Sequence, residues 1–142
     1  MTSQEVHRGR LIDHVQLVVQ DFHASQNFYK AVLASLEIPI AVSGDGYFLA
    51  DELFVTAKDS EAATGTLTGR HHLAFQARDR SMVDDFYKAA LAHGGRDNGA
   101  PGERAYHPGY YAAFVLDPDG NNIESVYRGE ATRSCSSVSI KF

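Results

Sequence analysis

Hydrophobic positions near the start of the chain change from a spacing of two to a spacing of three and four, which indicates a strand followed by a helix. Aliphatic residues dominate the stretch from Leu11 to Val19, which predicts a strand. Asp21 has the position of a helix N-cap, and Pro39 prevents the helix from continuing. The apolar stripe of this predicted helix consists of Phe28, Val32, Leu33 and Leu36.

Three short hydrophobic runs separated by turn residues follow the predicted helix. They extend from Ile38 to Val42, from Gly46 to Ala50 and from Glu52 to Ala57. Serine, glycine and aspartate between the first two runs, and Asp51 between the last two, are typical of tight turns. This part of the chain is therefore predicted to fold in the order βαβββ, and a polar linker from Lys58 to Arg70 follows it.

The second part of the chain repeats this order. Asp79 is the predicted N-cap of a helix from Met82 to His93, and Gly94-Gly95 is typical of a helix C-terminus. A turn with the sequence Asp-Pro-Asp-Gly precedes the last paired strand. The predicted strands of this part are Leu73 to Ala77, Tyr110 to Leu116 and Asn122 to Tyr127, with a short edge segment before the loop from Asn98 to Pro108.

An offset of 58 residues aligns the two parts of the chain. It pairs His14 with His72 and Asp21 with Asp79, and six further identities follow within the predicted helices. Eight identities in 21 aligned positions far exceed the roughly one expected by chance, which indicates an internal repeat. Each repeat therefore carries a histidine at the head of its first strand.

The repeat predicts an α+β fold with two βαβββ modules in a single domain that spans the chain. Module one covers about residues 10–58, and module two covers about residues 70–128. Residues 1–9 are polar and are expected to fray, and residues 129–142 form a polar tail. For the end of the tail, from Val138 to Phe142, an added edge strand and disorder are both open.

Charge and composition indicate a globular protein and argue against a nucleic-acid or membrane partner. The net charge is −5, and the chain has no basic run and no apolar run long enough to span a membrane. The single cysteine, Cys135, excludes an intramolecular disulfide, and we assign it no role. No apolar segment typical of a secretory signal is visible at the start, so we expect a cytoplasmic location.

The two modules, the histidine on the first strand of each, and the run D-P-D-G-N-x-I-E from Asp117 to Glu124 resemble the vicinal oxygen chelate superfamily. This superfamily includes glyoxalase I, extradiol dioxygenases, fosfomycin-resistance enzymes, methylmalonyl-CoA epimerase and bleomycin-binding proteins. The resemblance extends from about Ile12 to Tyr127. It implies that curled mixed sheets form a cleft for a divalent metal ion, held by residues that match His14, His72 and Glu124.

Two neutral imidazoles and one carboxylate suit Fe²⁺, Mn²⁺, Zn²⁺, Co²⁺ or Ni²⁺ and leave coordination positions open. A substrate can then bind such a metal through two neighbouring oxygens. The resemblance thus implies a glyoxalase-like enzyme with lyase, isomerase or dioxygenase chemistry. For Glu124, a buried position would require a polar partner, and the alternative is exposure on a solvated face.

Side chains around the implied ligands are further candidates. His71 is the alternative ligand if the strand register differs by one residue, because it points to the face opposite His72. Gln16 and Gln76 lie on the same faces as the two aligned histidines and are expected to line the site.

The loop that precedes the strand from Tyr110 gathers several polar side chains. Arg104 is a candidate for binding an anionic substrate group, and Tyr106 or His107 is a candidate proton donor or acceptor. The alternative is an ordinary loop whose tyrosines cover the sheet.

Relatives of glyoxalase I use a fourth ligand, a carboxylate on the last strand of module one. The corresponding position here falls near Val55, so the fourth ligand is expected to be missing. The remaining set is similar to that of extradiol dioxygenases and of fosfomycin-type thiol transferases, for which Arg128 and Arg133 offer part of a phosphonate-binding patch. A metal-free protein similar to the bleomycin-binding relatives is the alternative from another class, and the acidic net charge fits it.

In the shorter members of the superfamily the cleft often forms across a dimer. By this resemblance we expect a homodimer in which His14 of one chain joins His72 and Glu124 of the other.

Overall fold

The computed structural model describes residues 5–9, 12–67, 70–130 and 137–141. Within these residues, no helix combines the length and the apolar character needed to cross a membrane. Four positions named in the predictions lie outside the described residues: Leu11, Arg133, Cys135 and Phe142.

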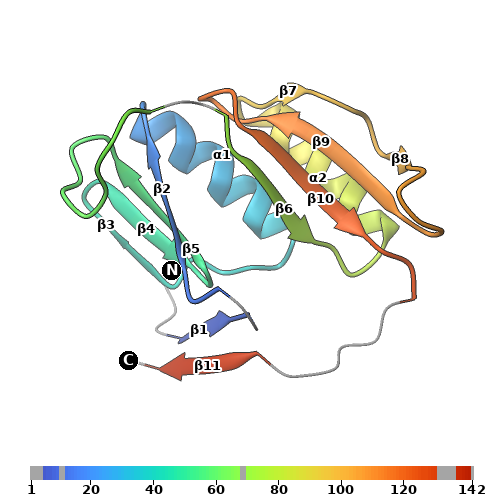
Figure 1. Ribbon diagram of the computed structural model, residues 1–142, viewed down its shortest axis with the longest axis horizontal. Helices are drawn as coiled ribbons and strands as arrows, with labels where there is room; N and C mark the ends of the chain where they lie inside the picture. Colours follow the sequence, from blue (N-terminus) through green and yellow to red (C-terminus); the bar gives the residue numbers. More distant parts are fainter. Residues whose placement is uncertain (1–4, 10–11, 68–69, 131–136, 142) are drawn as a thin grey trace.

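Two mixed sheets, one from each repeat, lie in front of two helices in the view of Figure 1. The helices are α1 (Phe22–Ser35) and α2 (Arg80–Ala92), and they pack against each other. The first sheet has the order β2 (Val15–Val19), β5 (Leu53–Ala57), β4 (Tyr47–Ala50) and β3 (Val42–Gly44). The second has the order β6 (His72–Gln76), β10 (Asn122–Tyr127), β9 (Tyr111–Leu116) and β7 (Arg96–Asp97), with β8 (Gly102–Glu103) also paired to β9.

The two sheets share one pattern of strand directions. In each, the first strand of the repeat is parallel to the last, and the other pairs are antiparallel. This arrangement confirms the predicted α+β fold class and shows the same strand order in both repeats.

Both helices have the predicted N-caps, but α2 begins at Arg80 and ends at Ala92, whereas the prediction was Met82 to His93. Asp21 accepts a hydrogen bond from the Ala24 N–H at 3.1 Å, and Asp79 accepts one from the Met82 N–H at 2.8 Å. These two carboxylates satisfy backbone donors that the first helical turn leaves unpaired. After α2 the chain turns through Gly94, whose φ of +91° favours glycine.

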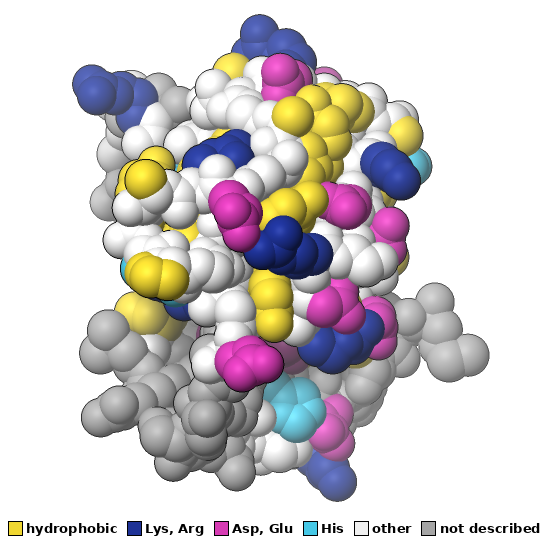
Figure 2. Space-filling view, turned by 90° about the vertical axis from the view of Figure 1, so that its right-hand side faces the viewer, with side chains coloured by type: hydrophobic (Ala, Val, Ile, Leu, Met, Phe, Trp, Pro, Cys, Tyr) yellow, Lys and Arg dark blue, Asp and Glu magenta, His cyan; other side chains and the backbone are white. Residues whose placement is uncertain are grey.

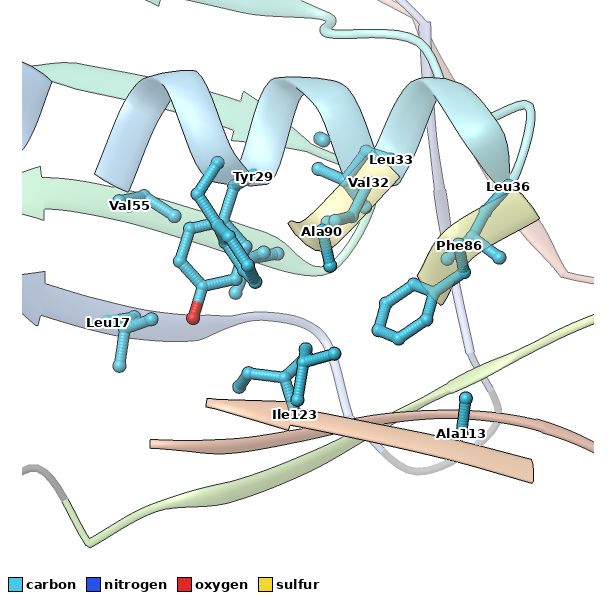
Figure 3. Packing of buried hydrophobic residues seen from close by; sticks show 14 of the residues in the cluster. Leu17, Tyr29, Val32, Leu33, Leu36, Val55, Phe86, Ala90, Ala113 and Ile123 are labelled. Carbon is cyan, nitrogen blue, oxygen red and sulfur yellow. The ribbon is translucent and has the colours of Figure 1, made fainter. Parts of the chain in front are cut away.

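One hydrophobic core takes side chains from both repeats (Figure 3). Gly95 brings the end of α2 against α1, because a Cβ at this position would lie 2.7 Å from the Phe28 ring. The residues of this core labelled in Figure 3 are Leu17, Tyr29, Val32, Leu33, Leu36, Val55, Phe86, Ala90, Ala113 and Ile123.

The Asp-Pro-Asp-Gly turn of module two is attached to α1 of module one through a buried carboxylate. Asp117 is 1% exposed, and its Oδ2 accepts hydrogen bonds from the Tyr29 hydroxyl at 2.5 Å and from Asn121 Nδ2 at 2.9 Å. Its Oδ1 accepts the backbone N–H groups of Asp119 and Asn121. The turn therefore closes the β9–β10 hairpin and also joins the two repeats.

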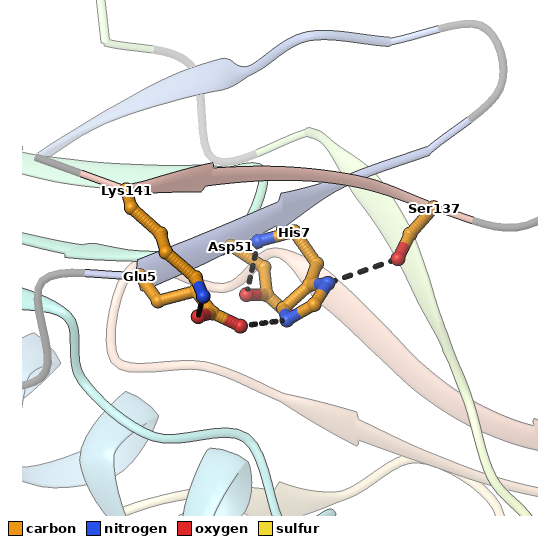
Figure 4. A network of polar contacts seen from close by, with 5 residues as sticks. All are labelled: Glu5, His7, Asp51, Ser137 and Lys141. Carbon is orange, nitrogen blue, oxygen red and sulfur yellow. Dashed lines mark hydrogen bonds and ion pairs between the residues drawn. The ribbon is translucent and has the colours of Figure 1, made fainter.

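Both ends of the chain contribute to a separate two-stranded sheet. Strand β1 (Glu5–Arg8) pairs antiparallel with β11 (Val138–Lys141). The prediction that residues 1–9 fray is therefore wrong for Glu5–Arg8. At the C-terminus, where an edge strand and disorder were both open, the structure has strand β11, which pairs with β1 and not with a main sheet. Figure 4 shows how His7 holds this unit in place: its N–H donates to Asp51 at 2.9 Å, and its ring contacts Glu5 and Ser137.

The strand predicted from Ile38 to Val42 is wrong in position. Strand β3 begins only at Val42. The backbone of Ile38 is still hydrogen-bonded to the end of α1, since its N–H donates to the Leu33 carbonyl at 2.9 Å, and Pro39, Ile40 and Ala41 belong to neither element. The turn that follows β3 is accordingly confined to Asp45 and Gly46.

Candidate functional site

Glu124 lies in the middle of β10, on the face turned away from the helices. Its neighbours Ile123 and Ser125 point to the opposite face, and Ile123 belongs to the core shared with the helices. Only 3% of the Glu124 side chain is exposed, and both of its oxygens have partners: Oε1 lies 3.1 Å from His72 Nε2, and Oε2 accepts a hydrogen bond from the Tyr110 hydroxyl. Glu124 is therefore a buried, partnered carboxylate and not an exposed side chain on a solvated face.

The ring of His72 is oriented by the backbone of β10. Its Nδ1 lies 2.8 Å from the carbonyl oxygen of Asn122, and a carbonyl oxygen only accepts, so Nδ1 carries a hydrogen. Its other nitrogen, Nε2, faces Glu124. The ring also stacks on Phe114, with centroids 6.2 Å apart and an angle of 22° between the planes. His72 is thus fixed on one side, while 48% of its side chain remains exposed.

Tyr110 is a candidate site residue to which the sequence predictions assigned no role. It is 7% exposed, and burial together with the hydrogen bond to Glu124 raises the pKa of Tyr110 to about 12. Its hydroxyl therefore stays protonated and donates to Glu124 at neutral pH. The register of the β9–β10 hairpin could have identified it, since Phe114 lies opposite Glu124 and alternation places Tyr110 on the same face.

The three candidates in the loop before β9 surround Tyr110 and Phe114. The rings of Tyr106 and His107 meet the Tyr110 ring edge-on, with centroids 5.0 Å and 5.2 Å away. Tyr106 is 70% exposed, and His107 Nδ1 is engaged by the carbonyl of its own neighbour. The guanidinium of Arg104 lies over Phe114, 5.4 Å from the ring centroid. Tyr106 and His107 thus contact the buried tyrosine by ring packing, and Arg104 lies above the ring that supports His72.

His14 lies apart from His72 and Glu124. Its side chain is 55% exposed, and its Nδ1 lies 2.6 Å from the Asp13 carboxylate. Across the ranges that the structure describes, no three His, Cys, Asp or Glu side chains converge closely enough to hold a metal ion. One chain therefore brings together two of the three predicted ligands.

The neighbouring candidates occupy other positions. His71 precedes β6, and its backbone N–H donates to Asn121 Oδ1 at 3.0 Å, so His72 is the residue beside Glu124. Gln16 donates to the hydroxyls of Thr56 and Ser60, both at 3.1 Å, and Gln76 is exposed at the end of β6.

The position of the missing fourth ligand is occupied by Phe54. Glu124 pairs with Ala74, and the repeat partner of Ala74 is Gln16, which pairs with Phe54. Phe54 is adjacent to Val55, near which the position was expected, and Val55 itself is fully buried in the core. Module one therefore has an aromatic ring where a carboxylate would be needed.

A family model of the Glyoxalase/Bleomycin resistance protein/Dioxygenase superfamily matches residues 11–125 of this chain. The chain belongs to this superfamily. No curated protein matches it.

Solved structures of other superfamily proteins share the fold. A glyoxalase/bleomycin resistance protein from Albidiferax ferrireducens T118 is 28% identical, with a TM-score of 0.67 and with 84% of this chain and 100% of that chain covered. A glyoxalase-related enzyme from Fulvimarina pelagi is 17% identical, with a TM-score of 0.63 and coverage of 89% and 99%. A lactoylglutathione lyase from Agrobacterium tumefaciens is 21% identical, with a TM-score of 0.61 and coverage of 83% and 93%. At these identities the last two show the fold alone.

The donor atoms of His72 and Glu124 fit a divalent metal ion. Their Nε2 and Oε1 atoms are 3.1 Å apart. Two ligand atoms that each lie about 2.1 Å from one metal, at roughly a right angle, are about 3.0 Å apart. The contact of His72 Nδ1 with a backbone carbonyl is also typical of metal-binding histidines, because it orients the ring and leaves Nε2 as the donor.

Proposed function

We propose that this member of the superfamily is a glyoxalase-like, metal-dependent enzyme that acts on a small substrate through two neighbouring oxygens. The observation that carries the proposal is the buried Glu124 carboxylate, held by Tyr110 and facing His72 Nε2. Burying a carboxylate is costly unless it has partners. A carboxylate that is buried on the open face of a sheet beside an oriented imidazole therefore suggests a functional site. Lyase, isomerase and dioxygenase reactions are all compatible with it.

His14, His72 and Glu124 are the proposed ligands of an Fe, Mn, Zn, Co or Ni ion. When bound, such an ion supplies Lewis acidity or activates oxygen. The chain's own residues hold the ligands in place. Tyr110 keeps its proton because burial and Glu124 raise its pKa to about 12, so it fixes one carboxylate oxygen and leaves the other toward His72.

The third ligand, His14, is proposed to come from a second copy of the chain. The side chains of His14 and His72 are both about half exposed, at 55% and 48%, so each can meet a group outside its own chain. In this arrangement a homodimer carries two equivalent sites, and each site combines module one of one chain with module two of the other.

Metal content tests the proposal. The protein, purified in chelator-free buffer, is expected to contain a transition metal or to take one up, as measured by elemental analysis. Replacement His72→Ala should lower metal occupancy by about tenfold or more, whereas His71→Ala, the matched loss of an imidazole one residue away, should leave it near the wild-type level.

Equal metal losses in the two variants would contradict the assignment of His72. A protein that contains no transition metal and takes none up would exclude the metalloenzyme and favour a metal-free binding protein, similar to the bleomycin-binding relatives. Thiol transfer to a phosphonate is a further reaction for the same ligand set, and Arg128, which lies 5.1 Å from the Tyr110 ring centroid, is its candidate anion-binding residue.

A further inference from the structure

Two arginines flank Glu124 on the open face of the second sheet, and neither has a carboxylate partner among the residues that the structure describes. The guanidinium of Arg104 lies over Phe114, and that of Arg128 lies 5.1 Å from the centroid of the Tyr110 ring. Each cation is therefore one aromatic ring away from the carboxylate, since Phe114 pairs with Glu124 across the strands and Tyr110 donates to it.

These two cations differ from other arginines of the chain. Arg78 forms an ion pair with Glu37 at 2.7 Å, and Arg80 forms one with Glu103 at 2.6 Å. The second pair also neutralises the carboxylate nearest to Arg104 in the sequence. On the face seen in Figure 2, acidic and basic side chains likewise alternate around a hydrophobic band. Unlike Arg78 and Arg80, Arg104 and Arg128 form no ion pair with another residue that the structure describes, and both lie beside the candidate site.

The backbone around Arg104 is shaped to hold its guanidinium. Nη2 donates to the carbonyl of Ala100 at 2.8 Å, and Nη1 donates to the carbonyl of Glu103 at 3.4 Å. A Cβ on Gly99 or Gly102 would lie 3.2 Å or 3.1 Å from the guanidinium nitrogens, so glycine at both positions leaves it room. Two of its five N–H groups are used, and the planar fork keeps three donors for a ligand.

We infer that Arg104 forms a subsite for an oxyanion of the substrate, a carboxylate or a phosphonate, and that Arg128 adds a second positive charge over the neighbouring Tyr110 ring. A guanidinium fixed in this way matches the two oxygens of such a group. The inference rests on the proposed function for its place in catalysis, but the subsite itself needs no metal. The substrate class that follows is a small acid with a hydroxyl or carbonyl oxygen next to its anionic group.

Ligand titration of the chelator-treated protein, followed by NMR, tests the subsite. Glycolate is expected to bind about tenfold more tightly than glycolamide, which has the same hydroxyl but no charge. Replacement Arg104→Ala should weaken glycolate binding by about tenfold, and Arg104→Lys should restore part of it, because the charge returns without the fork. The control is Arg78→Ala, which removes the same charge from a guanidinium already paired with Glu37.

Hydroxymethylphosphonate, titrated in parallel, shows which oxyanion is preferred. Equal binding of glycolate and glycolamide, or wild-type affinity in folded Arg104→Ala, would overturn the subsite. Arg104-dependent binding in a protein that takes up no metal would leave the subsite in place and reject the metalloenzyme. Metal uptake without glycolate binding would reject the subsite and leave the metalloenzyme in place.

Discussion

Tyr110 is the residue that fixes the Glu124 carboxylate, since its hydroxyl donates to Oε2. We predict that Tyr110→Phe lowers metal affinity by about 10–100-fold, because a ligand loses the hydrogen bond that orients it. Metal titration of the folded variant measures this effect. Tyr106→Phe is the matched control, because the Tyr106 side chain is 70% exposed and contacts Tyr110 only with its ring. Similar affinities in the two variants would mean that Tyr110 does not orient Glu124.

At the scale of single residues, the sequence identifies side chains that the repeat or a motif marks, and it misses those that only tertiary pairing defines. The repeat indicates His72 over His71, and the structure places His72 beside Glu124. No tyrosine of the first repeat aligns with Tyr110, and a second tyrosine, Tyr111, follows it directly. Only the hairpin register separates it from Tyr111, whose hydroxyl donates instead to Asp84 on α2.

At the scale of elements, the pairing of β2 with β5 decides which side chain faces the open side of module one. Phe54 is partly exposed there, and Val55 is fully buried. We predict that Phe54→Glu folds with a loss of at most about 2 kcal/mol in the free energy of unfolding, whereas Val55→Glu loses at least about 3 kcal/mol, because it buries an unpaired charge. Urea unfolding measures both, and the reverse order of stabilities would place the register one residue away.

The contact between α1 and the Asp-Pro-Asp-Gly turn depends on Tyr29. Replacement Tyr29→Phe removes its hydrogen bond to the buried Asp117, which should lower the free energy of unfolding by about 1.5–3 kcal/mol at pH 7. The matched control is Tyr106→Phe, which removes an exposed hydroxyl and should change stability little. Urea unfolding of the two variants gives both values.

The stabilising effect of Tyr29 should weaken in alkali. Burial, together with the negative charge of Asp117, raises the pKa of Tyr29 well above its ordinary value of 10.0. Above pH 10 the unfolded chain releases this proton while the folded chain keeps it, so the wild type loses up to about 1.4 kcal/mol per pH unit. Tyr29→Phe lacks this loss, so the stability gap between the two proteins should narrow between pH 9 and pH 11. If the difference in stability between the two proteins stayed constant from pH 9 to pH 11, the pKa of Tyr29 would not be raised in the folded protein.

The sequence predictions fail for two kinds of element: strands whose partner lies far away in the chain, and strands that begin close to the end of a helix. Helix ends are local, and both N-caps are confirmed because an aspartate and its backbone partner lie three residues apart. Strand β1 is polar by sequence, and its partner β11 lies at the other end of the chain. Strand β3 is misplaced because the backbone of Ile38 still completes α1, although its side chain is one that strands favour.

At the scale of the whole molecule, the two repeats share one core but leave their histidines on separate surfaces. The core joins α1 with α2 and both sheets, while His14 remains beside Asp13 and His72 beside Glu124. A site that needs both histidines can therefore be completed by a second chain. This arrangement predicts complementation between variants, which a site within one chain cannot show.

In the experiment, the His14→Ala and His72→Ala chains are unfolded, mixed in equal amounts and then refolded together. In a mixed dimer, one site receives both alanines, and the other receives the intact His14 of one chain with the intact His72 and Glu124 of its partner. Random association makes half of the dimers mixed, so about a quarter of all sites should regain metal. Each variant refolded alone is the control and should stay near zero. No recovery in a mixture that sedimentation shows to be dimeric would exclude a site shared between two chains.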